Sequence, residues 1–488
     1  MSGVSTNGYG DTPYDEMREL LSELNQGKKR GEKWVVKNQN DPRCILAMAT
    51  GNDPFYCGQP AQLEQAQWFA DLHERCGFSN KRTHLRFLHY VASGEEKNPI
   101  TGEFETAKKP DGSDYENTDE NWSFIVTASK FARHLGLVDP HLIVDRKTPR
   151  PHFFAPREPA PEPRSYVREA YLRFPKIDVN DLSAHLDPTY IGATGYEYTH
   201  AHEPSLVEVW VEKNLDSDPD APVIENLCRE LGVNLVTGVG FMTITSVHQL
   251  LERRAALGKP LRLLYMSDFD PAGDFMPNSP ARHIEFAIRN MNPVPDIRLM
   301  HLALTHRQVK EKGLPPMPIK ESDKRKDGFL EKYGVEGATE LNALLSEAHA
   351  EDFERMLKRT ILSLRDGTLP QRLRQARSEA NSRLRQEVGR RLHWPHKAFA
   401  LIEAEADEIA ARYTSLIEEL SEQLEEELAP LKERYERVRH AMPRRLAGLD
   451  EMELPEVEGV EDEWAAVGWL FDSRREYFTQ LRSYKDVV

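Results

Sequence analysis

The sequence predicts an α/β protein with a helical, winged-helix-like N-terminal module, a central and mainly parallel sheet, and a helical C-terminal extension. Between residues 207 and 304, β-rich runs alternate with helical stretches, which is the pattern of a doubly wound parallel sheet. The segment before them, residues 155–164 (APREPAPEPR), is rich in prolines that favour extended backbone and exclude helix. After about residue 343 the chain becomes helical and highly charged.

Composition limits the classes of protein that the chain can belong to. Its 488 residues suffice for two to four domains, at roughly 100–200 residues per domain. The net charge is 64 − 80 = −16, so any contact with DNA must come from local basic patches. Four cysteines without a CxxC pair predict neither a disulfide scaffold nor a structural zinc site. With no long apolar run and no secretory signal, we expect a cytoplasmic protein with no membrane contact.

The N-terminal part divides at residue 63. Residues 1–63 are mixed and polar, and we expect an extension with only short helices. Residues 64–154 begin with Trp68, Leu72 and Cys76 at helical spacing, which predicts an amphipathic helix. Two further helices are expected around the polar stretch 95–120, which is typical of a loop or a hairpin wing. Helices flanking such a wing indicate a winged-helix module that binds DNA, although a small helical bundle has the same pattern.

Residues 155–204 are expected to be a linker and lead-in, and the strands of the central sheet follow. The predicted strands lie at 207–213, 233–240, 261–270 and 297–304. Parallel α/β sheets bind their ligands beyond the carboxyl ends of the strands. Reactive side chains at these ends are therefore the first candidates for a functional site.

Two of the strand ends carry acids. The first ends in Glu212, and the third ends in Asp268-Phe269-Asp270 followed by Pro271 and Gly273, which force the chain out of the strand. Three converging carboxylates repel one another, and a hard divalent cation such as Mg²⁺ relieves the repulsion. Mg²⁺ suits phosphoryl chemistry because it stabilises charge on the transferring phosphate.

The DxD motif alone is weak evidence, because acids often form turns and cap helices. Aspartyl phosphatases also carry DxD, but usually at the first strand of the domain and followed by threonine or valine, whereas Ala272 follows here. Asp274 is a weaker fourth acid, which is equally suited to begin the next helix. Glu212 two strand units upstream makes the combination more specific than DxD alone.

The segments VEVWVEKN, LVTGVGFMTITSV and LLYMSDFDPAGDFM resemble the Toprim domain in the A subunit of type IIB topoisomerases (topoisomerase VI) and its bacterial and phage relatives. The resemblance covers roughly residues 82–345 and implies a Rossmann-like Toprim domain at 205–345, including a downstream tail with an ELxAL motif. It also implies that Glu212, Asp268 and Asp270 are catalytic residues that hold Mg²⁺ or Mn²⁺. Asp323 and Glu340 match acidic positions of the tail and have a supporting role. Double-stranded DNA as substrate and a homodimer are implied as well.

Members of this family that act as topoisomerases use a winged-helix tyrosine as nucleophile. The tyrosine of the matching helix is Tyr90, but aligning VASG with the family's helix end puts the nucleophile position at Leu88. Residues two apart point about 200° away from each other on a helix, so these two cannot both face a metal. Either Tyr90 is the nucleophile, or the chain lacks one and Tyr90 packs near Phe87. Candidate DNA contacts are Arg82, His84 and Arg86, with His89 on the same helix and Lys213 beside the first acid.

The C-terminal region, residues 346–488, contains two charge blocks. Residues 358–391 hold ten Lys or Arg against three acids, and residues 403–428 hold ten acids against one arginine. Apolar residues recur at helical spacing from Ile409 to Leu424, which predicts one long helix or a coiled-coil arm. The basic block is suited to DNA phosphates, to solvent, or to pairing with the acidic block.

The sequence therefore predicts an Mg²⁺-dependent enzyme that cleaves DNA, either as a topoisomerase-like transesterase or as a hydrolytic nuclease. Its expected setting is DNA defence or mobile-element biology, with the protein associated with the nucleoid when bound to DNA. The alternative is a non-catalytic DNA-binding or scaffold subunit that recruits a partner ATPase. The sequence has no GxxxxGK[ST] phosphate loop, so any ATP-driven step requires another protein.

Overall fold

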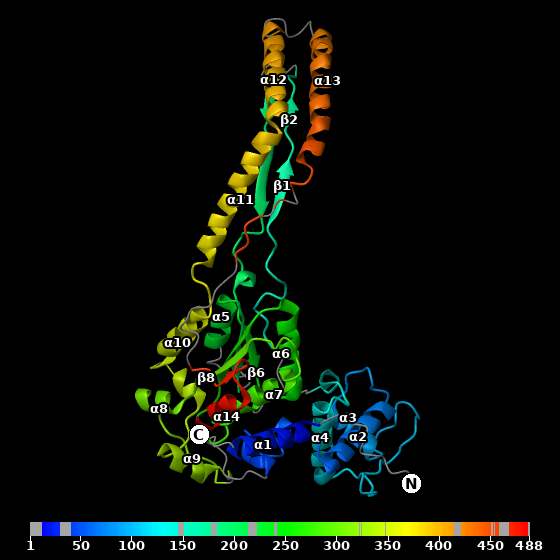
Figure 1. Ribbon diagram of the computed structural model, residues 1–488, viewed down its shortest axis with the longest axis vertical. Coiled ribbons are helices and arrows are strands. Elements are labelled where there is room, and N and C mark those ends of the chain that lie inside the picture. Colours follow the sequence, from blue (N-terminus) through cyan, green and yellow to red (C-terminus); the bar gives the residue numbers. More distant parts are fainter. Residues whose placement is uncertain are drawn as a thin grey trace. The chain divides into compact units, whose positions relative to one another are not determined.

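The computed structural model is a mixed α/β structure, 51% helical (Figure 1). It describes residues 12–29, 41–144, 151–176, 183–212, 222–238, 242–321, 323, 325–346, 348–413, 421–449, 452, 454–457 and 468–486. The chain divides into two units. Unit 1 comprises Met1–Glu158, Pro204–Arg365 and Glu461–Val488, and unit 2 comprises Pro159–Glu203 and Asp366–Val460.

Unit 1 is built on a five-stranded sheet with the order β6-β5-β7-β8-β9. Its strands are β5 (Leu206–Val211), β6 (Asn234–Thr237), β7 (Leu261–Met266), β8 (Ile297–Ala303) and β9 (Phe471–Asp472). The first four are parallel, as the sequence predicts, and β9 adds an antiparallel edge. Every residue of β5, β6 and β7 is buried, which explains their continuous apolar runs. Because β5 and β7 are neighbours, the acids that follow them lie at one edge of the sheet.

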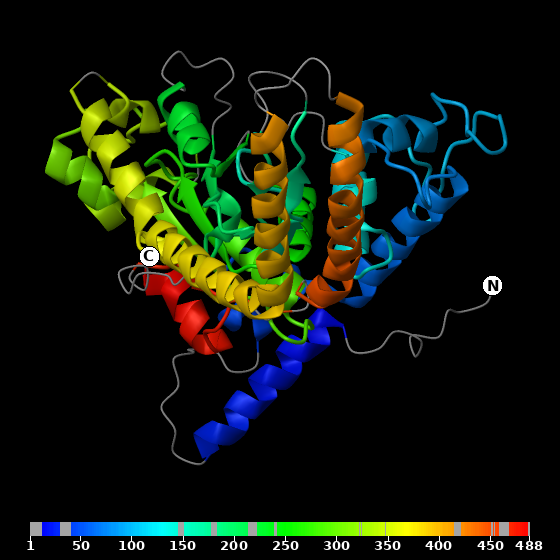
Figure 2. The same cartoon turned by 90° about the horizontal axis from the view of Figure 1, so that it is seen from above.

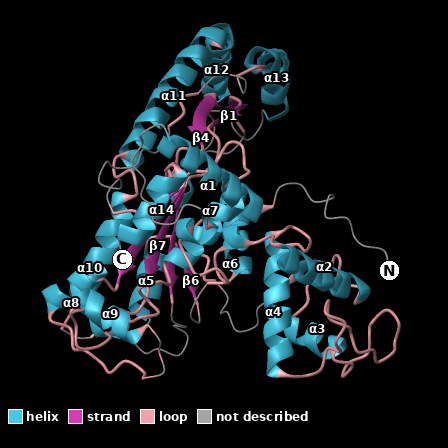
Figure 3. Ribbon diagram, turned by 60° about the horizontal axis from the view of Figure 1, so that its bottom comes forward, coloured by secondary structure: helices cyan, strands magenta, loops and turns pink. Residues whose placement is uncertain are grey.

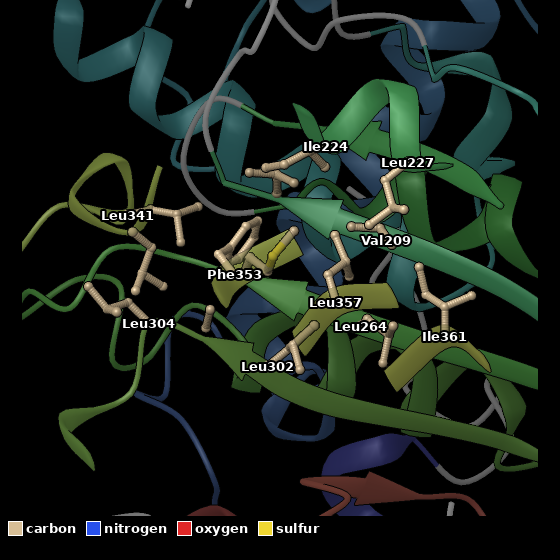
Figure 4. Packing of buried hydrophobic residues seen from close by; sticks show 14 of the residues in the cluster. Val209, Ile224, Leu227, Leu264, Leu302, Leu304, Leu341, Phe353, Leu357 and Ile361 are labelled. Carbon is tan, nitrogen blue, oxygen red and sulfur yellow. The ribbon is translucent and has the colours of Figure 1, made fainter. Parts of the chain in front are cut away.

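Helices cover both faces of this sheet. On one face, α5 (Pro222–Glu230), α9 (Lys326–Tyr333) and α10 (Ala350–Ser363) share a core with β5 and β7 (Figure 4). On the other face, α6 (Ile244–Leu257), α7 (Asn278–Ile288) and α14 (Tyr477–Asp486) pack in a second core. A short helix, α8 (His306–Lys312), follows β8.

The N-terminal part of unit 1 is helical. Its helices α2 (Pro60–Arg75), α3 (Leu85–Ala92) and α4 (Asp119–His134) enclose their own apolar core (Figure 3). The polar stretch between α3 and α4 contains isolated bridges, Ser93 with Thr106 and Lys108 with Asp114, rather than a strand hairpin among its described residues.

The extension 1–63 is more ordered than the sequence suggested. It contains the 17-residue helix α1 (Pro13–Lys29), so the expectation of only short helices is wrong. Proline at the start and acids in the first turn favour a helix there. The short 3₁₀ turns η1 (Pro42–Ile45) and η2 (Pro54–Tyr56) pack with α1 against Phe286 of α7 and Leu481 of α14.

Unit 2 combines two antiparallel strand pairs with three helices. The strand β1 (Arg164–Arg168) pairs with β4 (Tyr190–Thr194), and β2 (Tyr171–Arg173) pairs with β3 (His185–Asp187). They share a core with α11 (Leu369–Arg391), α12 (His393–Tyr413) and α13 (Ser421–Leu446). Residues 155–204 are thus more than a linker, since most of them belong to the same unit as 366–460. The last residues of the expected C-terminal region, 461–488, belong to unit 1 instead.

The expected long helix across 403–428 is two helices. Within the described residues, α12 ends at Tyr413 and α13 begins at Ser421, and Figures 1 and 2 show the two side by side. Ion pairs join Arg412 to Glu427 (2.9 Å) and Glu405 to Arg434 (2.5 Å), so the helices run antiparallel. Two apolar residues of the predicted stripe, Leu416 and Leu420, lie outside the described residues. None of the described helices has the length and apolar character that crossing a membrane requires.

Candidate functional site

The carboxyl ends of β5 and β7 bring Glu212 and Asp268 together. Glu212 directly follows β5, and its Oε2 accepts a hydrogen bond of 3.1 Å from the backbone N–H of Asp268. These residues are 56 positions apart in the chain, and the parallel pairing of β5 with β7 makes them neighbours. The two acids that the sequence placed at separate strand ends therefore share one site.

Asp268 also contacts the downstream tail. Its Oδ1 accepts a 2.7 Å hydrogen bond from the backbone N–H of Leu341, at the start of the 3₁₀ turn η6 (Leu341–Leu344). Phe269 and Thr339 exchange backbone hydrogen bonds of 2.9 and 2.8 Å beside it. Glu340 precedes the turn as its N-cap residue. The ELxAL segment thus lies against the second acidic strand end, and it fixes the Asp268 carboxylate.

The turn after β7 fixes Asp270. Its Oδ1 accepts hydrogen bonds from the backbone N–H groups of Ala272 (2.8 Å) and Gly273 (2.5 Å). A Cβ on Gly273 would lie only 2.0 Å from the carbonyl oxygen of Asp268, so this close turn requires glycine. The two acids of the DxD motif are therefore held by backbone amides as the chain leaves the strand.

Asp274 has a different role. Its carboxylate pairs with Lys332 Nζ at 2.9 Å and accepts a 2.6 Å hydrogen bond from Tyr333 Oη. Burial and this contact raise the pKa of Tyr333. Asp274 therefore holds α9 against the acidic turn and is not positioned as a fourth metal ligand.

Glu212 and Asp268 are the side chains best placed to hold a divalent cation. Among the described residues, no three His, Cys, Asp or Glu side chains are arranged so that they could hold a metal ion together. Mg²⁺ usually keeps several waters and takes one or two protein carboxylates together with substrate phosphates. The carboxylate oxygens of Glu212 and Asp268 are hard ligands of the kind that this open mode of binding uses, and the described residues form no closed cage of ligands.

A cleft of about 900 Å³ lies in unit 1 between the N-terminal helices and the central α/β part. Its walls come from the loop after η1, the start of α3, one face of α4, the start of α6, and α7 with the turn before it. Four cationic side chains line it: Arg86, Lys130, Arg133 and Arg325. Among the described residues that line it, none is Asp or Glu. Although the chain is acidic overall, this cleft is suited to an anion such as a phosphodiester.

Two cations of the cleft are held in place by neighbours on its N-terminal side. The Arg86 guanidinium lies 4.1 Å from the centre of the Trp122 ring. Lys130 donates to the carbonyl of Gly51, and burial lowers the pKa of its ammonium group.

Arg325 connects the cleft to the acids. Its hydrogen bond and ion pair with Asp323 (3.0 Å), together with the charge of Asp270, raise the pKa of its guanidinium. Arg325 thus lines the cleft and also lies within electrostatic range of the acidic turn. Asp323, a supporting acid in the sequence prediction, serves as its partner.

The start of α6 joins the two walls of the cleft. Thr243 caps this 14-residue helix by accepting from Ser246 N–H at 3.1 Å. Thr245 Oγ1 donates to the carbonyl of Ile143 at 3.0 Å, which ties the N-terminal helices to α6. The positive end of the helix dipole adds to the field in the cleft.

The two candidate nucleophile positions, Leu88 and Tyr90, lie on different faces of α3. Leu88 is fully buried in the core of the N-terminal helices. Tyr90 is half-buried and lies four residues after Arg86, on the same helix face, but it does not line the cleft.

The residues that the sequence predicted to contact DNA lie in different environments. His84 caps the helix by accepting from Arg86 N–H at 3.0 Å, and both residues line the cleft. His89 is buried, with hydrogen bonds to Tyr115 (2.7 Å) and Asn117 (2.8 Å), so it cannot reach a phosphate. Arg82 is exposed outside the cleft. Lys213 lies outside the described residues.

Sequence reasoning missed the contribution of α4 to the cleft. The side chains of Trp122, Val126, Lys130 and Arg133 line it together. Their spacing of four, four and three places them on one helix face, which was a detectable signal. Arg325 carries no such signal, because only the tertiary fold brings it to the cleft.

No protein-family model matches this chain, and no curated protein matches it.

Proposed function

We propose that this protein cleaves DNA strands with the aid of Mg²⁺ or Mn²⁺, using water as the nucleophile. In this proposal, residues 205–345 form a Toprim domain and residues 64–154 form a winged-helix module. The contact between Glu212 and Asp268 at the ends of adjacent parallel strands carries the proposal. The cationic cleft, which has no Asp or Glu among its described lining residues, supports it, because the charge of Asp270 acts on Arg325 in its wall.

The cleft would hold the DNA backbone. Phosphates would lie against Arg86, Lys130 and Arg133, at the N-terminus of α6. Arg325, which lines the cleft and on which the charge of Asp270 acts, would contact the scissile phosphate. A guanidinium at that position stabilises negative charge that develops on a phosphate.

Glu212 and Asp268 would hold the cation, and the turn that contains Asp270 would set their spacing. When bound, the cation would stabilise the negative charge that develops on the phosphate under attack. The backbone amides of Leu341 and Asp268 orient the two carboxylates, so the protein fixes them before substrate binds. The Asp270 carboxylate would attract the Arg325 guanidinium toward the acidic turn.

We take water as the nucleophile because Leu88 is buried and has no nucleophilic atom. Among the described residues, no hydrogen bond joins Tyr90 to Glu212 or Asp268. Cleavage would therefore leave free DNA ends rather than a covalent protein–DNA adduct. A homodimer would place two such sites on the two strands of a duplex.

The test is nicking of supercoiled plasmid by the full chain in the presence of Mg²⁺ or Mn²⁺. We expect Glu212→Gln and Asp268→Asn to lower the rate by about 100-fold or more. Glu311→Gln is a matched control, since this exposed acid lies on α8. We expect Tyr90→Phe to cleave normally, and denatured products to stay out of the protein phase.

Two results would count against this proposal. Adducts that disappear in Tyr90→Phe would establish a transesterase in place of a hydrolase. Binding of DNA without cleavage under any condition, unchanged in Glu212→Gln, would favour the non-catalytic scaffold that works with an ATPase. The backbone hydrogen bonds that hold all three carboxylates are the observation that favours this second function, because they give the acids a structural role.

A further inference from the structure

The outer face of the β1–β4 pair in unit 2 presents aromatic and cationic side chains. In this register Tyr166 lies opposite Gly192, and Arg168 lies opposite Tyr190. Directly opposed residues share one face of an antiparallel pair. Ile191 and Ala193, which point to the other face, are buried in the core shared with α11. The tyrosines and Arg168 therefore point away from that core.

The two tyrosines form an exposed pair whose position is fixed. Tyr166 is 41% exposed and Tyr190 is 45% exposed, with ring centres 5.8 Å apart. A Cβ on Gly192 would lie 2.8 Å from the Tyr166 hydroxyl oxygen, so the ring lies over this glycine. Packing of an aromatic ring over a cross-strand glycine holds the ring in place and leaves part of it open to solvent.

Arginines surround this pair. A hydrogen bond with Tyr190 raises the pKa of Tyr166, whereas the charges of Arg377 and Arg168 act in the opposite direction. Arg377 is a residue of α11, so the helix and the tyrosine face adjoin. Together they form what we call the Tyr–Arg face: Arg164, Tyr166, Arg168, Tyr190 and Arg377.

Among the described residues, no acid of the 403–428 block forms an ion pair with α11. The helix contains seven arginines and two glutamates, and three exposed arginines, Arg374, Arg383 and Arg385, form no ion pair with a described residue. The described acids of α12 and α13 that form ion pairs do so with cations of those same helices, such as Arg412 and Arg434. Of the three roles open to the basic block, pairing with the acidic block thus receives no support.

We propose that the Tyr–Arg face binds single-stranded nucleic acid. Bases would stack on Tyr166 and Tyr190, and phosphates would lie against Arg164, Arg168 and Arg377. A duplex keeps its bases stacked on one another, so it could use the arginines but not the tyrosines. The proposal involves unit 2 alone and does not depend on the proposed cleavage activity.

The test measures fluorescence anisotropy of a labelled oligothymidylate of about 20 nucleotides, longer than the ~4–16 nucleotides that one such surface covers. The full chain carries Arg86→Gln and Lys130→Gln throughout, which weakens the cleft, and EDTA prevents cleavage. We expect Tyr166→Leu and Tyr190→Leu each to weaken binding by about tenfold. Tyr166→Phe, which keeps the ring, should bind within about twofold of the parent chain.

The controls separate a lost binding surface from lost folding. Tyr413→Leu removes a tyrosine at the acidic end of α12 and should leave affinity unchanged. Arg168→Gln with Arg377→Gln should reduce the salt dependence of binding. Equal binding by Leu and Phe variants, equal affinity for a duplex of the same length, or no binding by the parent chain would overturn the proposal.

Discussion

At the turn after β7, a side chain on Gly273 would overlap the carbonyl oxygen of Asp268. The separation from a Cβ would be 2.0 Å, and the next nearest atoms are the Asp268 carbonyl carbon at 2.9 Å and Asp270 Oδ1 at 3.2 Å. The same turn directs two backbone N–H groups at Asp270. At the scale of single residues, the acid site therefore depends on a glycine that itself performs no chemistry.

This argument predicts that Gly273→Ala destabilises the protein by about 1–3 kcal/mol and lowers any activity of the acid site. Gly328→Ala is the matched control, because Gly328 is in α9 and a Cβ added there would meet nothing within 4 Å. Helix propensity predicts that this control is neutral or stabilising by up to about 1 kcal/mol. Urea denaturation of both variants measures the difference, and equal midpoints would contradict the steric argument.

At the scale of elements, Arg282 of α7 connects three segments that are far apart in the chain. Its fully buried guanidinium pairs with Asp53 at 3.1 Å and Glu285 at 3.0 Å, and donates to Tyr477 of α14 at 2.8 Å. Burial lowers the pKa of Arg282, whereas the tyrosine and the two carboxylates raise it. The pKa is therefore held well above its usual value. The contact fixes the N-terminal extension and α14 on the layer beside the central sheet.

We therefore expect Arg282→Met to destabilise unit 1 by about 3–5 kcal/mol, because two carboxylates lose their buried partner. Arg307→Met is the control, since Arg307 is 82% exposed on α8. Chemical denaturation followed by tryptophan fluorescence measures both. If Arg282→Met lowers the free energy of unfolding by less than about 1 kcal/mol, water or other groups replace the arginine as partner of the two carboxylates.

At the scale of the whole molecule, buried histidines couple stability to pH. Burial and the nearby His283 hold the pKa of His134 well below its usual value, with Arg133, Lys130 and His248 acting in the same direction. Burial lowers the pKa of His248 to about 4 and that of His301 to about 4. These groups come from α4, α6 and β8, so protonation would disturb several layers of unit 1 at once.

The sign of the effect follows from linkage. An unfolded histidine has a pKa of about 6.5, and the folded values are lower, so the unfolded state binds more protons between about pH 4 and 6.5. Stability is fully present above about pH 6.5 and decreases as pH falls through this range. We expect a lower urea midpoint at pH 5.5 than at pH 7.5, and a smaller difference in His134→Phe. A midpoint that rises on acidification would contradict this account.

The sequence was informative where local patterns reflect burial. Strands β5 and β7 were predictable because parallel strands covered on both faces are apolar without interruption. The four short strands of unit 2 were missed because each covers only three to five residues, too few to show a periodic pattern. The break between α12 and α13 was missed because leucines continue at helical spacing across it.

The sequence by itself determined which residues end the central strands, and so which carboxylates were candidates, because periodicity and turn chemistry are local. Only the tertiary structure decided that Glu212 lies against Asp268, that Leu341 binds the same acid, and that Arg325 reaches the cleft. These neighbours depend on the order in which distant strands pair and on how helices pack over them. The spacing of nearby residues reveals neither the strand order nor the helix packing, because contacts between distant segments depend on how the whole unit packs.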